Sequence, residues 1–197
     1  MKNQCTKERF LDDIKTHKLS ILQDDGLYRH IRLSRPKSST YRFDIITWPG
    51  YLCITGDMGC WTFFRTEDMF EFFIYKDTIE INPQYWAEKV QSISVFGGPM
   101  KEFNSYTFRE GVIQRISEYY EDNEEKKNEC LEEIESDVFF YLSDEHPQSI
   151  YQKLYEFKFE DFYFDECPSS EEYTFHYIWI LYAIVYGINE YNKVKKL

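Results

Sequence analysis

The sequence predicts an α+β fold, in which an N-terminal antiparallel β-meander of four to five strands packs with C-terminal helices. Residues 1–66 contain short runs of β-branched and aromatic residues between glycine and proline turns, which is typical of strands. From residue 67 onward, apolar residues recur at helical spacing. The 197 residues show no internal repeat and no obvious linker. We therefore expect a single domain over residues 1–197, strand-rich over 1–66 and mostly helical over 67–197.

The N-terminal part is expected to begin with a short helix over residues 6–18, with Phe10, Leu11 and Ile14 on one face. Strands are then expected at 19–22, 27–33, 41–48, 51–55 and 60–65, with turns at 24–26, 49–50 and 56–59. Several of these strands are apolar on both sides. Both faces of the sheet are therefore expected to be at least partly covered.

The rest of the chain is expected to be helical. Short helices are expected at 68–73 and from Pro83, capped by Asn82, to about residue 91. Two apolar stripes indicate longer helices, one of Phe108, Val112, Ile116 and Tyr119 and the other of Leu131, Ile134, Val138 and Leu142. A further helix is expected from Pro147 to Tyr155.

The last helix should be capped by Ser169 or Ser170 and run to about Asn192. It is apolar nearly all round, so we expect it to lie centrally in the core. Its uncharged run from Tyr177 to Ile188 is too short to cross a bilayer. The N-terminal residues lack an apolar segment, so no signal peptide is expected.

The net charge of −12 disfavours direct binding to nucleic acid or to anionic lipid, because carboxylates repel phosphates. It permits binding to a basic partner protein. The charge is concentrated, since residues 118–145 carry a net −10 and residues 156–172 a net −6, whereas residues 1–50 carry +4. The candidate interaction residues are Glu121, Asp122, Glu124, Glu125, Glu129, Glu132, Glu133, Glu135, Glu160, Asp161, Asp165 and Glu166.

Two interpretations of these acidic segments remain open. They form ordinary solvated helix faces, or they imitate the phosphate rows of DNA and occupy a basic groove of a nucleic-acid-binding protein. Aromatic residues between the acids, such as Tyr119 and Tyr163, are expected to anchor such an interface. The oligomeric state is left open.

Catalytic and metal-binding motifs are weak in this sequence. The 56–59 turn lacks the residues of a phosphate-binding loop, and the four histidines lack metal-ligand spacing, so neither a metal nor a cofactor is expected. The five cysteines contain no C-x-x-C and are expected to be reduced. His30 could approach Asp44 across two strands as an acid–base pair.

A second hypothesis is a small-molecule or nucleotide-processing protein with a pocket near the 56–59 turn, lined by Trp48, Asp57, Trp61 and Arg65. The sequence leaves enzymatic activity open and favours a non-enzymatic role. For Asp57 itself, a structural role in the turn is favoured over catalysis.

The stretch WPGYLCITGDMG within residues 48–59, with INPQYWAEK and FHYIWILYAIVYGINEY further along, resembles a family of small proteins of phages and prophages. The resemblance implies a phage-encoded protein acting in a bacterial host cytoplasm, and it implies no catalytic residue. By analogy with other small acidic phage proteins, an anti-CRISPR or other anti-defence role is expected. A structural or regulatory phage protein is the third hypothesis.

Overall fold

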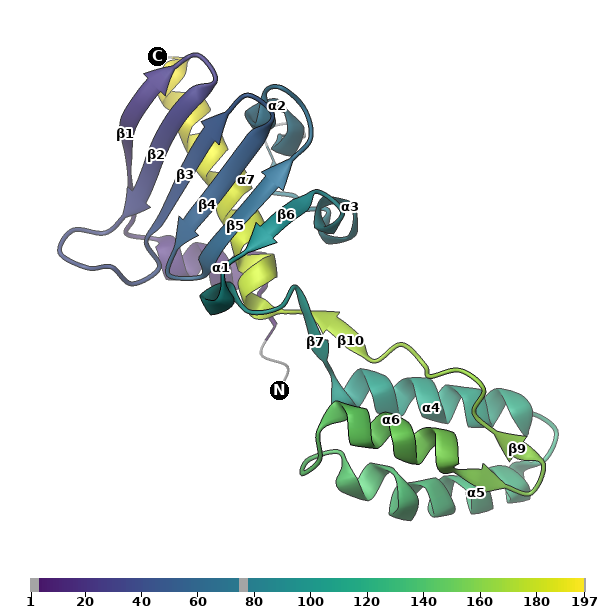
Figure 1. Ribbon diagram of the computed structural model, residues 1–197. Coiled ribbons are helices and arrows are strands. Elements are labelled where there is room, and N and C mark those ends of the chain that lie inside the picture. The colour runs from purple at the N-terminus through teal and green to yellow at the C-terminus, as the bar shows by residue number, and fades with distance from the viewer. Residues whose placement is uncertain (1–3, 75–77, 197) are drawn as a thin grey trace. The chain divides into compact units, whose positions relative to one another are not determined.

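The computed structural model describes residues 4–74 and 78–196, and the α+β class is confirmed. The chain divides into two compact units. Residues 1–100 and 173–197 form what we call the sheet unit, and residues 101–172 form the acidic unit. In the sequence, the acidic unit is inserted between the sheet and the last helix of the sheet unit (Figure 1).

The described elements of the sheet unit are α1 (Lys7–Ile14), β1 (Lys18–Asp25), β2 (Tyr28–Ser34), β3 (Phe43–Trp48), β4 (Tyr51–Gly56), β5 (Gly59–Phe64), α2 (Met69–Phe73), α3 (Pro83–Ala87), β6 (Val90–Ile93), the 3-10 turn η1 (Val95–Gly97) and α7 (Phe175–Lys195). Those of the acidic unit are β7 (Lys101–Phe103), α4 (Ser105–Tyr119), α5 (Glu124–Asp137), the 3-10 turn η2 (Phe139–Tyr141), α6 (Pro147–Glu156), β8 (Lys158–Phe159), β9 (Phe162–Tyr163) and β10 (Glu171–Tyr173), whose last residue belongs to the sheet unit.

The meander continues into a sixth strand. Its order is β1-β2-β3-β4-β5-β6, and every neighbouring pair is antiparallel. The sixth strand, β6, lies where the sequence predicted the end of a helix, because α3 ends at Ala87. Pairing of Val90 with Phe63 and of Ile93 with Trp61 extends the sheet. The mainly helical character expected after residue 67 is therefore interrupted here.

The turn between β4 and β5 depends on glycine. Gly59 has a φ of +89°, and a Cβ added there would lie 2.3 Å from the Cα of Gly97. A Cβ on Gly56 would lie 2.0 Å from the carbonyl oxygen of Arg42. Both contacts involve backbone atoms, which cannot rotate away as a side chain would. The glycines of the WPGYLCITGDMG stretch therefore allow two other backbone segments to approach the turn closely.

The core of the sheet unit lies between one face of the sheet and α7, which runs behind the strands in Figure 1. Trp179 of α7 is 1% exposed and packs edge-on against Phe10 and Phe43. Its Nε1 donates a hydrogen bond to Asp13 Oδ2 at 3.0 Å. The central position expected for the last helix is thus observed.

The start of α7 differs from the expectation. Thr174 caps the helix, its hydroxyl accepting from the backbone N–H of Tyr177. Ser170 instead has its hydroxyl 2.8 Å from that of Tyr151, and the residues after it form β10, which pairs with β7. The sequence predicted that residues 171–173 form the first turn of this helix. They form a strand instead, because they pair with β7.

The second face of the sheet carries no described helix and is the face seen in Figure 1. It presents Trp48, Tyr51 and Phe64 side by side, with ring centroids 5.2 and 4.7 Å apart. The ring of Phe64 is 44% exposed. The expectation that both faces would be covered is therefore not met within the described residues.

The acidic unit has its own core beneath α4, α5 and α6. The buried residues that these helices contribute are Phe108, Val112 and Ile116 from α4, Cys130 and Ile134 from α5, and Ile150 and Leu154 from α6. The predicted stripes therefore face inward, except that Tyr119 is 55% exposed. Every residue of this core lies between 103 and 167, and every residue of the sheet unit's core lies outside that range. Each unit therefore has a hydrophobic core built from its own residues alone.

No helix among the described residues is both long enough and apolar enough to span a membrane.

Candidate functional site

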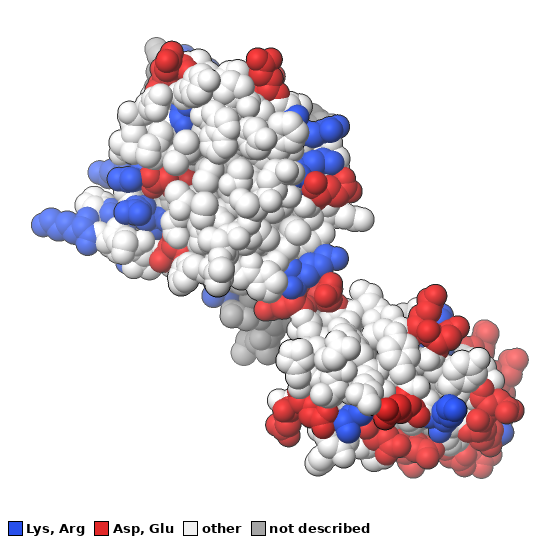
Figure 2. All heavy atoms as spheres, viewed as in Figure 1, with Lys and Arg blue, Asp and Glu red and all other residues white. Residues whose placement is uncertain are grey.

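The two units differ sharply in charge. Residues 101–172 hold 21 Asp and Glu against 7 Lys and Arg, a formal net charge of −14. The sheet unit holds 14 acidic and 16 basic residues, a net of +2. Figure 2 shows the carboxylates gathered over the helices of the acidic unit, while the visible face of the sheet unit is mostly uncharged. The negative charge of the chain therefore belongs to the inserted unit.

All twelve acidic residues singled out by the sequence are exposed. They fall into two groups. The first follows the end of α4 and the outer side of α5, and the second lies in the turn between β8 and β9 and in the segment after β9. On α5, Cys130 and Ile134 face the core, so Glu129, Glu132 and Glu133 are turned to solvent. Asn123 caps this helix by accepting from the N–H of Lys126.

Ion pairs neutralise four of the twelve carboxylates. Glu124 pairs with Lys127, Glu135 with Arg109, Glu160 with Lys126 and Asp165 with Arg115. The other eight make no ion pair with another described residue; they are Glu121, Asp122, Glu125, Glu129, Glu132, Glu133, Asp161 and Glu166. The unpaired carboxylates on α5 therefore leave its outer side strongly negative.

The four residues of the predicted pocket do not converge. Trp61 is fully buried in the core and donates from Nε1 to the carbonyl of Met58 at 3.0 Å. Trp48 lies on the opposite face of the sheet, stacked on Tyr51. Arg65 is exposed beyond the end of β5. These positions give no common cavity for a small molecule.

Asp57 has the structural role that was expected. It lies in the turn between β4 and β5, and its Oδ2 accepts from the backbone N–H of Tyr41 at 2.9 Å. Tyr41 adopts a φ of +58°, which is uncommon for a residue with a side chain. The carboxylate therefore helps to hold the loop before β3 against this turn.

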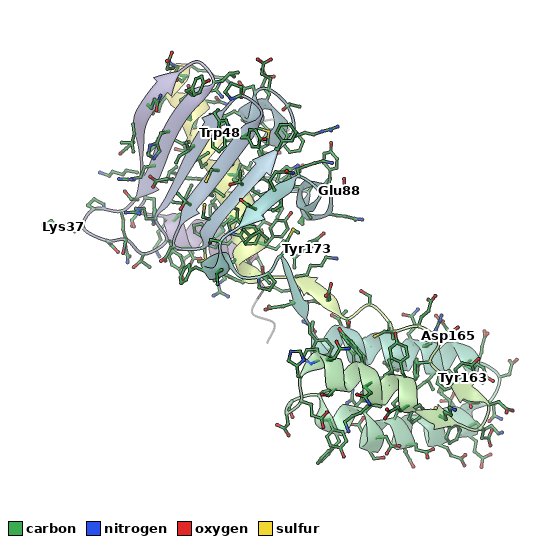
Figure 3. All side chains as sticks on the ribbon, in the orientation of Figure 1. Lys37, Trp48, Glu88, Tyr163, Asp165 and Tyr173 are labelled. Atoms are coloured by element: carbon green, nitrogen blue, oxygen red, sulfur yellow. The ribbon has the colours of Figure 1, made fainter. Side chains whose placement is uncertain are left out.

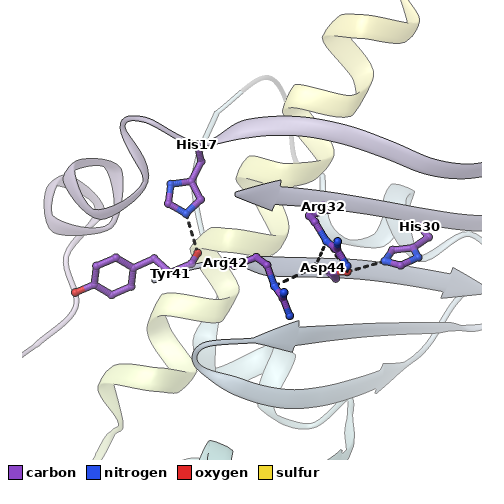
Figure 4. A network of polar contacts seen from close by, with 6 residues as sticks. All are labelled: His17, His30, Arg32, Tyr41, Arg42 and Asp44. Atoms are coloured by element: carbon purple, nitrogen blue, oxygen red, sulfur yellow. Dashed lines mark hydrogen bonds and ion pairs between the residues drawn. The ribbon is translucent and has the colours of Figure 1, made fainter. Parts of the chain in front are cut away.

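His30 and Asp44 do meet, as the strand pattern suggested (Figure 4). Their Nε2 and Oδ2 atoms lie 2.7 Å apart. Arg32 holds the same carboxylate through Nε and Nη2, and the Arg42 Nε atom lies 3.9 Å from Oδ1. With two arginines and a histidine around it, Asp44 serves first as the acceptor of an ion-pair network on the uncovered sheet face.

The pKa of Asp44 reflects two opposed effects. Burial alone would raise it, but the hydrogen bonds from Arg32 and His30 outweigh burial and hold the pKa below its usual value. A carboxyl with a lower pKa in the folded than in the unfolded chain stabilises the fold above its ordinary pKa of about 4. That contribution is lost as the pH falls through the lowered pKa.

Replacing Asp44 by asparagine is therefore expected to lower the free energy of unfolding at pH 7 by roughly 1–3 kcal/mol, because charged hydrogen bonds are lost. The difference from the wild type should shrink as the pH falls below about 4. Urea unfolding at pH 7 and pH 3 measures both values. Asp12→Asn is the control, since Asp12 forms an exposed pair with Lys15. A difference that is the same at both pH values would show that the carboxylate charge is not responsible.

Cys53 and Cys60 are both reduced, with Sγ atoms 3.5 Å apart on the uncovered face. They are diagonal neighbours, since Cys53 lies opposite Thr62 and Cys60 opposite Thr55. Burial, together with the neighbouring thiol, raises the pKa of Cys53 to about 11, so it is a poor nucleophile at neutral pH. Within the described parts of the chain, no group of three or more metal-ligating side chains comes together.

No protein family model, no curated protein and no solved structure matches this chain. The candidate site therefore rests on the geometry and the charge of the molecule itself, and the acidic unit is its most distinctive feature.

Proposed function

We propose that this is a phage-encoded interaction protein that inhibits a bacterial defence complex, with its acidic unit occupying a basic, nucleic-acid-binding surface of that complex. The observation that supports the proposal is the separation of charge, −14 on the acidic unit against +2 on the sheet unit. The phage setting comes from the resemblance of the WPGYLCITGDMG stretch. A CRISPR effector is the partner that we favour.

The charge spacing on α5 suits imitation of DNA. The helix carries seven carboxylates over 14 residues, or about 21 Å of length at the usual helical rise. This is one carboxylate per roughly 3 Å, compared with about 3.4 Å per phosphate along one DNA strand. Lys126 and Lys127 reduce the net density to one charge per roughly 4 Å. Per unit of length, a groove lined with Lys and Arg would therefore encounter a density of negative charge similar to that of a DNA strand.

The decisive variant reverses Glu129, Glu132 and Glu133 to lysine. These residues are exposed and unpaired, so their replacement should leave the fold intact and weaken binding at least about tenfold, through slower association and lost contacts. The measurement is displacement of labelled target DNA from a purified CRISPR effector with its guide RNA. Binding should also weaken strongly between low and high salt.

The matched control makes the same change of charge in the sheet unit, with Glu67, Glu71 and Glu80 reversed to lysine. These residues are also exposed. An equal loss of binding in both variants would mean that only the total charge of the protein matters. Affinity that persists after reversal on α5, or that is insensitive to salt, would contradict mimicry of DNA.

A further inference from the structure

A groove runs along α4 on the side away from α5. It consists of two cavities of about 570 and 410 Å³, which share Arg115 and Glu118 in their linings. One wall is α4, and the other is formed by residues between 161 and 169. Figure 3 labels Tyr163 and Asp165 on this second wall.

The groove is distinct from the acidic side of α5. Arg109 of α4 reaches Glu135 on α5, while Arg115 reaches Asp165 in the opposite wall of the groove. Helix α4 therefore separates two acidic surfaces. A ligand in the groove and a ligand on the outer side of α5 would touch different residues, and the two surfaces can be tested independently.

Three tyrosine rings stand exposed along the groove. Tyr106, Tyr119 and Tyr163 are 59%, 55% and 61% exposed, although large aromatic side chains usually bury most of their area. Tyr119 is held in place by its neighbours, since its ring centroid lies 4.9 Å from that of Phe162. Tyr119 therefore offers a fixed aromatic surface, and all three rings are open to a ligand rather than buried in the core.

The charged groups in the groove select the kind of ligand. Its lining contains five carboxylates, which are Glu110, Glu118, Asp161, Asp165 and Glu166. Arg115 is the one cation in the two linings, and its Nη2 atom lies 3.5 Å from Asp165. Carboxylates beside exposed rings suit guanidinium groups, which form forked hydrogen bonds and stack on aromatic faces. Lysine offers the charge but not the planar stacking.

We propose that this groove binds an extended, arginine-containing segment of a partner protein. The inference rests on the proposed function in one respect, that the segment belongs to the basic partner. From Tyr106 to Tyr119 the groove follows about 20 Å of helix. An extended chain covers that distance with about six residues. The segment is therefore a short linear motif, with arginines spaced to meet the rings and the carboxylates.

The test uses two fluorescein-labelled peptides of eight residues, one alternating Arg and Gly and the other Lys and Gly. Their charge is equal, so a general electrostatic attraction would bind both equally. The full-length protein is expected to bind the arginine peptide at least about fivefold more tightly in fluorescence anisotropy, since stacking adds to the charge attraction. Tyr119→Ala with Tyr163→Ala should abolish this preference without altering the net charge of −12.

Two further variants keep the test decisive. Tyr163→Ala alone should reduce the preference. Because the Tyr163 side chain is exposed, this variant should fold, which circular dichroism checks. Tyr28→Ala is the matched control, because Tyr28 is similarly exposed but lies in the sheet unit. It should keep the preference for arginine.

The outcomes separate this inference from the proposed function. Equal binding of both peptides, or a preference that survives the double tyrosine variant, would overturn the groove site while leaving displacement of DNA by the α5 surface unaffected. A preference for arginine that depends on the tyrosines would support the groove even if the protein displaced no DNA from any effector. In that case the proposed function would be contradicted, while the groove site would still be supported.

Discussion

Replacing Gly59 by alanine is expected to lower the free energy of unfolding of the sheet unit by about 3 kcal/mol or more. The residue adopts a φ of +89°, and an added Cβ would lie 2.3 Å from the Cα and 2.7 Å from the N of Gly97. Backbone strain and steric overlap each cost roughly 1–3 kcal/mol. Urea unfolding followed by tryptophan fluorescence measures the change.

Gly26→Ala separates the two contributions. Gly26 also has a positive φ, of +59°, but an added Cβ would meet nothing within 4 Å. It should therefore show only the cost of the backbone conformation, about 1 kcal/mol. If both alanine variants were destabilised equally, the close approach of Gly97 to Gly59 would not matter. A larger effect at Gly59 would assign the conspicuous glycines of this stretch to packing rather than to chemistry.

Removing the acidic unit is the change with the largest expected effect on function. A chain in which about three Gly and Ser residues replace 101–172 should still fold, because each core is confined to its own unit. The ends to be joined are close, since the N–H of Thr174 donates to the carbonyl of Met100 at 3.0 Å. The formal net charge would change from −12 to +2.

The shortened protein is expected to unfold cooperatively and to displace no DNA from a CRISPR effector. Near-ultraviolet circular dichroism reports the tertiary packing around Trp61 and Trp179, and the displacement assay reports function. A shortened chain without fixed tertiary structure would show that the sheet unit needs the insert. A folded chain that still displaced DNA would move the interaction surface to the sheet unit.

Local signals in the sequence predicted much of the fold. Asn82 caps its helix as expected, accepting from the backbone N–H of Tyr85. Asp68, expected as the first residue of a helix, is the residue that caps α2, accepting from the backbone N–H of Phe70. The meander and its turns follow from alternation and glycine placement. In the register of β2 and β3, Ile31 lies opposite Ile45 and Arg32 opposite Asp44. This register places the side chains of His30 and Asp44 on the same face of the sheet, where they meet. These features depend on residues that are near in sequence or on neighbouring strands.

The failures have a common physical cause, which is contact between distant parts of the chain. Serine is a residue type that often caps helices, which is why Ser170 was predicted as a cap. The backbone after it is extended instead, because β10 pairs with β7. A correct prediction of the pocket would have required the register of β4 and β5, which decides the face of the sheet on which each side chain lies. In that register, Trp61 falls on the core side with Phe63, while Trp48 lies in line with Tyr51 and Phe64. The boundaries of the two units also carry no linker composition that the sequence could reveal.

The groove was also missed, although a signal for it is present. Tyr106, Glu110, Gln114 and Glu118 recur every four residues and so follow one side of α4. What the sequence could not supply was the opposite wall, since residues 161–169 reach this helix only through the fold of the whole acidic unit.

The insertion of the acidic unit before α7 has a consequence for biosynthesis. The sheet is complete at Ile93, but the helix that covers its apolar face begins only at Phe175. Translation of the roughly 80 residues between them takes roughly 4–16 s at ordinary ribosomal rates. During that interval Leu33, Phe43 and Ile45, which lie against Gly187 of α7 in the complete fold, lack this helix, while the contiguous acidic unit can fold by itself. The ribosome would therefore release a chain whose acidic unit is already formed and whose sheet closes last.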